Sequence, residues 1–167
     1  MNMKESNSPE FIFNNEGDSI QINRKFRAPR TTVWNAWTKP ELTDQWWAPK
    51  PWKAQTKEMN FVKGGYWLYA MVSPEGQKHW ARADILETDE YNSFKVKDGF
   101  SDENGNIDSD LPCPTWVVKF EDQGNDCIVR LHISFQNSQE LDKLLEMGFR
   151  EGFTMALENL DELLENG

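Results

Sequence analysis

The spacing of the apolar residues changes near residue 137. Before it, apolar and polar residues alternate in several short segments, the pattern of half-buried β-strands. After it, apolar residues recur every three or four positions, as on one face of a helix. The expected strands are one that begins at Ser19 and ends at Ala28-Pro29, and 54–61, 65–73, 78–88, 92–100, 114–121 and 126–136. The later spacing predicts one long helix over about 138–165.

Two short helices are expected between the first strand and the others. Val33, Trp34 and Trp37 lie on one side of the first, and Pro40 suits the first turn of the second, which extends through Trp46-Trp47. The order strand, two helices, six strands and a long helix predicts an α+β fold, with an antiparallel sheet of six or seven strands against the helix. A length of 167 residues suits a single domain over 11–167, preceded by a flexible tail over 1–10.

Charge and composition exclude several classes of protein. A net charge of −10 argues against nucleic acid and anionic membranes as partners, because both require a basic face. No apolar run is long enough to span a membrane, and two cysteines are too few for a disulfide framework, so a cytoplasmic protein is expected. His79 and His132 lack metal-ligand spacing, and no glycine-rich phosphate motif is present, so no metal or other cofactor is expected. The sequence leaves open whether Cys113 and Cys127 pair.

Three segments together resemble one known family. They are Arg24–Leu42 with Trp46-Trp47-Ala48-Pro49, Gly64–Met71 with Pro74-Glu75-Gly76, and Met147–Phe153 with Leu157 and Leu160. In this order they resemble the activator-of-Hsp90-ATPase homologue family of the START-like, or SRPBCC, superfamily. The resemblance implies a helix-grip fold, a curved sheet wrapped on the long C-terminal helix with a deep cavity between them. Two departures are Phe153, where the family more often has Trp, and an acidic insert over 101–113.

The side chains that would line this implied cavity follow from the alternation. Residues on one face of each strand, with glycines on the apolar face of the helix, give the expected ligand-binding set Trp67, Tyr69, Met71, Phe94, Trp116, Gly148, Phe149 and Gly152. Trp46 and Trp47 are expected to cover the mouth as a lid. The alternative is that these rings simply fill the core. Arg82 and Asp84 are expected on the outer face, opposite Ala81, Ala83 and Ile85; in the opposite register they would form an ion pair inside the cavity. His79 is a candidate for the inner face.

Three functions remain open. The aromatic stripes favour a protein that holds a small apolar or amphipathic molecule. The family resemblance alone implies a regulator of an Hsp90-type chaperone ATPase. Relatives in the superfamily also include enzymes, and a cyclase- or hydrolase-like activity would need an acid or base with a shifted pKa in the cavity. Glu58, Asp84 and Glu151 are candidates, but nothing in the sequence selects among them, so no catalytic residue is assigned. Exposed sheet edges also make a homodimer compatible with the fold.

Overall fold

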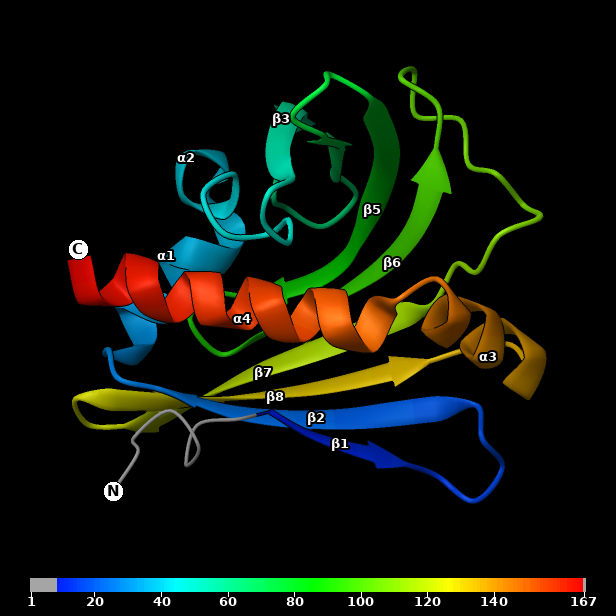
Figure 1. Cartoon of the computed structure of the whole chain (residues 1–167). Coiled ribbons are helices and arrows are strands. Elements are labelled where there is room, and N and C mark those ends of the chain that lie inside the picture. The colour runs from blue at the N-terminus through cyan, green and yellow to red at the C-terminus, as the bar shows by residue number, and fades with distance from the viewer. Residues whose placement is uncertain (1–8, 167) are drawn as a thin grey trace.

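The computed structural model describes residues 9–166, and residues 1–8 of the expected tail lie outside them. One antiparallel sheet carries eight strands in the order β1-β2-β8-β7-β6-β5-β4-β3. Figure 1 shows this sheet curving around the C-terminal helix, which confirms the predicted α+β helix-grip architecture. The strands are β1 (Glu10–Phe13), β2 (Ser19–Phe26), β3 (Lys53–Met59), β4 (Tyr66–Val72), β5 (Lys78–Asp89), β6 (Ser93–Ser101), β7 (Thr115–Gln123) and β8 (Asp126–Ser134).

The short strand β1 is the element that the alternation did not predict. Four residues are too few to establish a period of two, and β1 pairs only with β2 at the edge of the sheet. The other seven strands lie within about two residues of their predicted bounds. The outer-face prediction is also confirmed, because Arg82 and Asp84 form a partly exposed ion pair with Nε and Oδ1 2.9 Å apart, while Ala83 and Ile85 are buried.

The C-terminal helix is interrupted, which corrects the prediction of one helix over 138–165. Helix α3 (Ser138–Glu146) ends at Met147, and α4 (Phe149–Asn166) begins after Gly148. Gly148 has a φ of 90°, a left-handed conformation that glycine adopts at little cost. The predicted start is right, since the Asn137 side chain caps α3 by accepting a hydrogen bond from the Glu140 backbone N–H at 2.9 Å.

The two short helices supply indole rings to the core. They are α1 (Arg30–Thr38) and α2 (Pro40–Thr43), the second shorter than expected and followed by turns through Trp46-Trp47. The side chains of Trp34, Trp37 and Trp46 are buried and meet one another or neighbouring rings edge to face. Trp46 also donates from Nε1 to the Ala36 carbonyl at 2.8 Å. These rings form part of the hydrophobic core.

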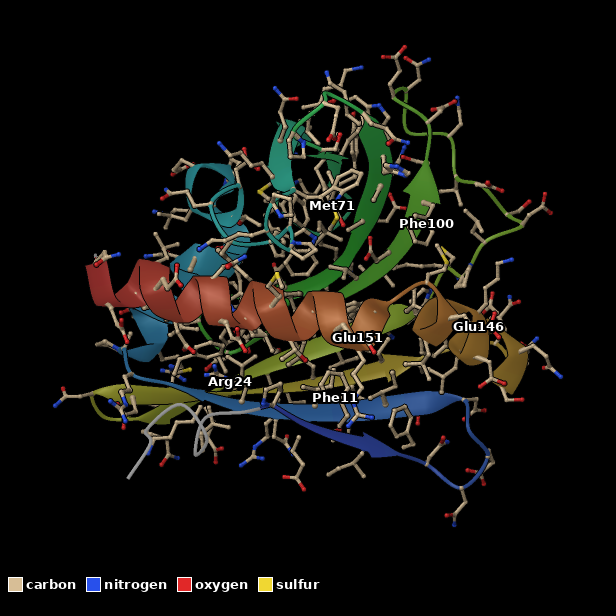
Figure 2. All side chains as sticks on the ribbon, in the orientation of Figure 1. Phe11, Arg24, Met71, Phe100, Glu146 and Glu151 are labelled. Carbon is tan, nitrogen blue, oxygen red and sulfur yellow. The ribbon has the colours of Figure 1, made fainter. Side chains whose placement is uncertain are left out.

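Helix α4 is tied to the rest of the fold by polar contacts. The buried Arg24 of β2 pairs with Asp161, and Figure 2 shows Arg24 between β2 and α4. Asn159 donates from Nδ2 to the backbone carbonyls of Trp46 and Ala48, at 3.4 and 3.0 Å. These contacts hold α4 at a set distance from the sheet. None of the helices described is long and apolar enough to cross a membrane.

Candidate functional site

A cavity of about 260 Å³ lies between the inner face of the sheet and helices α3 and α4. One water molecule needs only about 10–15 Å³ measured in this way, so the space is large enough for an organic molecule. Figure 2 shows Met71 and Phe100, two of its lining residues, on strands that rise above α4. The structure places seven of the ten residues singled out in the sequence in its wall: Trp47, Tyr69, Met71, Trp116, Gly148, Phe149 and Gly152.

A second, inner cavity of about 30 Å³ lies against the core. Trp67 and Phe94, expected in the ligand-binding set, line this inner cavity and not the larger one. The two cavities share Trp47, Asp98 and Trp116, which therefore stand between them. Trp46, expected in the lid, lines neither cavity, because it is 1% exposed within the core.

Two alanines of β5 create the space in front of the sheet. The strand register places Ala83 between Trp67 and Asp98. In the next row of side chains on the inner face, Ala81 lies between Tyr69 and Phe100. Since side chains in such rows point to the same face, each methyl group leaves a gap between two long neighbours. The cavity therefore depends on small residues of the sheet as much as on the glycines of the helix.

The two helix glycines contribute in different ways. The sequence suggested that Gly148 lies inside a helix. In the structure it instead forms the break between α3 and α4, beside the cavity. Gly152 lies within α4, and a Cβ built there would meet Pro49 Cγ at 3.6 Å, an ordinary contact. Its missing side chain therefore widens the cavity locally without being required for helix packing.

Aromatic rings hold one another in place around the cavity. Phe149 and Phe153 stack with centroids 5.4 Å apart, and Trp116 meets both edge to face. Trp67 and Tyr69 stack at 4.0 Å on β4. Phe153 thus takes part in the wall although the family more often has Trp there. Rings fixed by several neighbours lose little further freedom on binding, so the wall is preorganised.

Asp98 is the residue of the site that the sequence analysis missed. It shares the inner face of β6 with Phe94, Val96 and Phe100, and the period of two from those residues was the signal that could have found it. Its Oδ1 is buried without a hydrogen-bond partner. Burial raises the pKa of this carboxyl group to about 7. Asp98 thus has the property that an acid–base role requires.

Tyr69 provides a hydroxyl group in the same cavity. Its oxygen accepts a hydrogen bond from Trp47 Nε1 at 3.0 Å. Burial first, and then the charge of Asp98, raise the pKa of the phenol well above its usual 10, so Tyr69 keeps its proton at neutral pH. The phenol is therefore a hydrogen-bond donor in the cavity.

The earlier acid–base candidates do not enter the cavity. Glu58 and Glu151 are exposed, and Asp84 lies on the outer face with Arg82. His79 lies at the edge of the cavity with its ring 5.2 Å from that of Trp52, whereas His132 is exposed. Within residues 9–166 no three His, Cys, Asp or Glu side chains gather as metal ligands would. Cys113 and Cys127 are both free thiols.

The acidic insert contributes its end to the wall. Asp102 organises the first turn of this segment by accepting backbone hydrogen bonds from Asn104 and Asn106, each at 2.9 Å. The Asn106 side chain also donates to Asp102 at 2.8 Å, and this hydrogen bond first, then the backbone ones, lowers the pKa of Asp102. Farther along, Pro112 near the end of the insert and Pro114 just after it line the larger cavity. The insert therefore lies beside the site, with its acidic residues at the surface.

Comparison with solved structures gives matches over almost the whole chain. A protein from Arthrobacter aurescens is 28% identical with a TM-score of 0.88, covering 95% of this chain and 92% of its own. A protein from Mycobacterium smegmatis is 28% identical with a TM-score of 0.84, covering 93% and 95%. One from Staphylococcus epidermidis is 26% identical with a TM-score of 0.81, covering 92% and 93%. No curated protein matches the chain.

The match to a family model covers the helices, six of the eight strands, and every lining residue discussed above. The family is described as activator of Hsp90 ATPase homolog 1-like protein, and its model matches residues 27–165. Strands β1 and β2 precede the match. Both the fold and this match agree with the resemblance carried by the three sequence segments. The chain therefore belongs to the activator of Hsp90 ATPase homolog 1-like family, within the START/SRPBCC superfamily.

Proposed function

We propose that this protein binds a small apolar or amphipathic molecule in the larger cavity between the sheet and α4. The observation that carries the proposal is a cavity of about 260 Å³ walled mainly by aromatic and aliphatic side chains. Ligand pockets are usually apolar, with a few polar groups that orient the ligand, and measure about 300–1,000 Å³. The volume here favours a compact molecule of one or two rings.

Titration of the intrinsic tryptophan fluorescence tests this proposal. Trp47 and Trp116 line the cavity, so a bound molecule should quench or shift their emission. The variant Ala81→Leu places a larger side chain on the cavity floor, and Thr88→Leu makes a comparable change at an exposed position of the same strand. Saturable binding of one chemical class should weaken at least about tenfold in Ala81→Leu and persist in Thr88→Leu. A flat response to apolar and amphipathic compounds alike would contradict the proposal.

A second candidate comes from the description of the family. Regulation of an Hsp90-type chaperone would require a protein-docking surface in place of, or beside, the cavity. The test is the ATP turnover of such a chaperone with this protein in excess. Increased turnover that persists in Ala81→Leu would favour chaperone regulation independent of ligand, whereas unchanged turnover would count against it.

A third candidate is acid–base catalysis on the bound molecule. The observation that favours it is Asp98, whose carboxyl group has a pKa of about 7 inside an aromatic cavity, where a general acid or base is effective near neutral pH. Each compound that binds in the titration can be incubated with the protein and analysed by mass spectrometry. Conversion by the wild type but not by Asp98→Asn would support an enzyme. A compound that keeps both its mass and its chromatographic retention time is not converted, and this result for every bound compound would exclude catalysis for those compounds.

A further inference from the structure

We propose that the molecule held in this cavity carries a hydroxyl group, which donates a hydrogen bond to Asp98 and accepts one from the indole N–H of Trp116. This inference rests on the proposed binding function and adds the chemical class of the ligand. Its basis is that buried polar atoms of residues in the cavity wall have no hydrogen-bond partner.

Two of the unpartnered atoms belong to residues shared by the two cavities. Within residues 9–166, the buried side-chain polar atoms without a hydrogen-bond partner are Arg24 Nε, Trp37 Nε1, Asp98 Oδ1 and Trp116 Nε1. The last three line the inner cavity, and Asp98 and Trp116 also line the larger one. Buried polar groups in proteins nearly always have a partner, since burying one unpaired costs free energy. The unpartnered Asp98 and Trp116 in the wall of the larger cavity therefore point to a polar group of a ligand.

Asp98 and Trp116 are near enough to share one small polar group. Trp116 pairs with Val96 in the sheet, and Asp98 is two residues farther along the same face of β6. The backbone N–H of Asp98 donates to the Pro114 carbonyl at 3.0 Å, which fixes this part of β6 against the segment leading into β7. Diagonal neighbours on one face are about 7–8 Å apart at Cα, within reach of a long side chain such as Trp. A single oxygen between them can contact both.

The donor and acceptor types select the hydroxyl group. An ammonium group has donors only, so it would pair with Asp98 but leave Trp116 Nε1 without an acceptor. A carboxylate has acceptors only, so it cannot pair with the ionised form of Asp98, beside which it would bring a second negative charge. A hydroxyl group both donates and accepts, and therefore satisfies Asp98 and Trp116 together. Apart from the Tyr69 hydroxyl and His79 at the edge, the remainder of the wall is largely apolar and suits a hydrocarbon skeleton.

Four compounds on one skeleton test the choice. They are 2-methylindane, which is apolar, 2-indanol, the cation 2-aminoindane, and indane-2-carboxylate. Tryptophan fluorescence of the full chain measures their dissociation constants at pH 7. We expect 2-indanol to bind about tenfold more tightly than 2-methylindane, and more tightly than either charged compound, because only the alcohol satisfies both partners.

Substitution of Asp98 assigns the preference to this residue. In Asp98→Leu the advantage of 2-indanol over 2-methylindane should disappear, while the affinity for 2-methylindane is kept or increased. Asp89→Leu makes the same change at an exposed position at the end of β5 and should keep the preference. If Asp98→Leu does not fold, Asp98→Asn, which retains an acceptor oxygen of the same size, should keep part of the preference.

Three results would overturn the proposal, and they are distinguishable. Equal affinities for 2-indanol and 2-methylindane in the wild type would leave the binding function intact and assign the polar atoms to ordered water. Tightest binding of 2-aminoindane or of the carboxylate would likewise leave binding intact and change the ligand class. Binding of none of the four compounds would contradict the proposed function as well as the hydroxyl group.

Discussion

Asp98 is the residue at which pH should alter stability most clearly. Burial raises its pKa from 3.8 to about 7 in the folded protein. Between these values the folded protein holds a proton that the unfolded chain releases. The free energy of unfolding therefore falls as pH rises from about 4 to about 7, by up to about 4 kcal/mol for this group.

The variant Asp98→Asn should remove this dependence, because an amide does not ionise. The free energy of unfolding of Asp98→Asn minus that of the wild type should be larger at pH 8 than at pH 5. Urea denaturation of both proteins at the two pH values measures the change. Asp89→Asn, at an exposed position of β5, is the matched control. A difference between Asp98→Asn and the wild type that is the same at both pH values would show that Asp98 is not desolvated in the folded state.

At the scale of the element, the strands could be predicted and the break in the C-terminal helix could not. The period of two in a strand is a local signal, and it located seven strands within about two residues. The spacing of Leu144, Leu145, Phe149 and Phe153 continues across the break, and in the sequence Gly148 and Gly152 look equivalent. Only the backbone distinguishes them, since Gly148 has a φ of 90° and Gly152 is helical.

Gly148→Ala and Gly152→Ala should therefore have opposite effects on stability. Gly148→Ala should lower the free energy of unfolding by about 1–2 kcal/mol, because a Cβ is strained in the left-handed region. Nothing lies within 4 Å of its added Cβ, so the cost is that of the backbone alone. Gly152→Ala should raise the free energy of unfolding by up to about 1 kcal/mol through helix propensity.

Urea denaturation of the two alanine variants against the wild type checks both signs. Each variant is the control for the other, because both add one methyl group beside the same cavity. A Gly148→Ala variant as stable as the wild type would mean that α3 and α4 rearrange, for example into a single helix, when the glycine is removed. A destabilised Gly152→Ala would mean that the contact with Pro49 is tighter than 3.6 Å implies.

At the scale of the whole molecule, the cavity depends on which strands become neighbours. The sequence indicated that Trp67 and Tyr69 share a face, but not that Ala83 and Ala81 would lie beside them in the sheet. The position of Asp98 across from Ala83 likewise follows from strand pairing. Local periodicity gives the face of each strand, whereas the empty space arises where small residues of one strand meet large residues of its neighbours.

The attachment of α4 to the sheet is a second property of the whole molecule. Alternation places Arg24 on the same face as Ile20 and Ile22, where a charge would be costly without a partner. Its partner, Asp161, lies 137 residues farther along, with the Arg24 Nη1 3.1 Å from Oδ1, and the guanidinium also donates to the Lys25 carbonyl at 2.7 Å. Arg24 is 3% exposed and Asp161 32%. This pair therefore fixes one end of the helix that closes the cavity.

Removing one member of this pair should be more harmful than removing both. Asp161→Ala leaves the Arg24 charge buried without its carboxylate and should lower the free energy of unfolding by about 3 kcal/mol. Arg24→Met with Asp161→Ala removes that charge, so a double-mutant cycle measured by urea denaturation should give a coupling energy of about 1–3 kcal/mol.

The pair Lys50–Glu162 also joins α4 to another part of the chain, but both of its side chains are more than 60% exposed, so as the matched comparison it should couple by less than about 1 kcal/mol. If the two cycles gave equal coupling, Arg24 would be hydrated in solution through movement of α4 away from β2. The cavity that α4 closes would then be wider in solution than about 260 Å³, and 2-indanol would lose the close contact with Trp116 on which its preference depends. If instead the Arg24–Asp161 pair couples strongly, the helix is held against the sheet, and the cavity keeps the dimensions that favour a compact ligand.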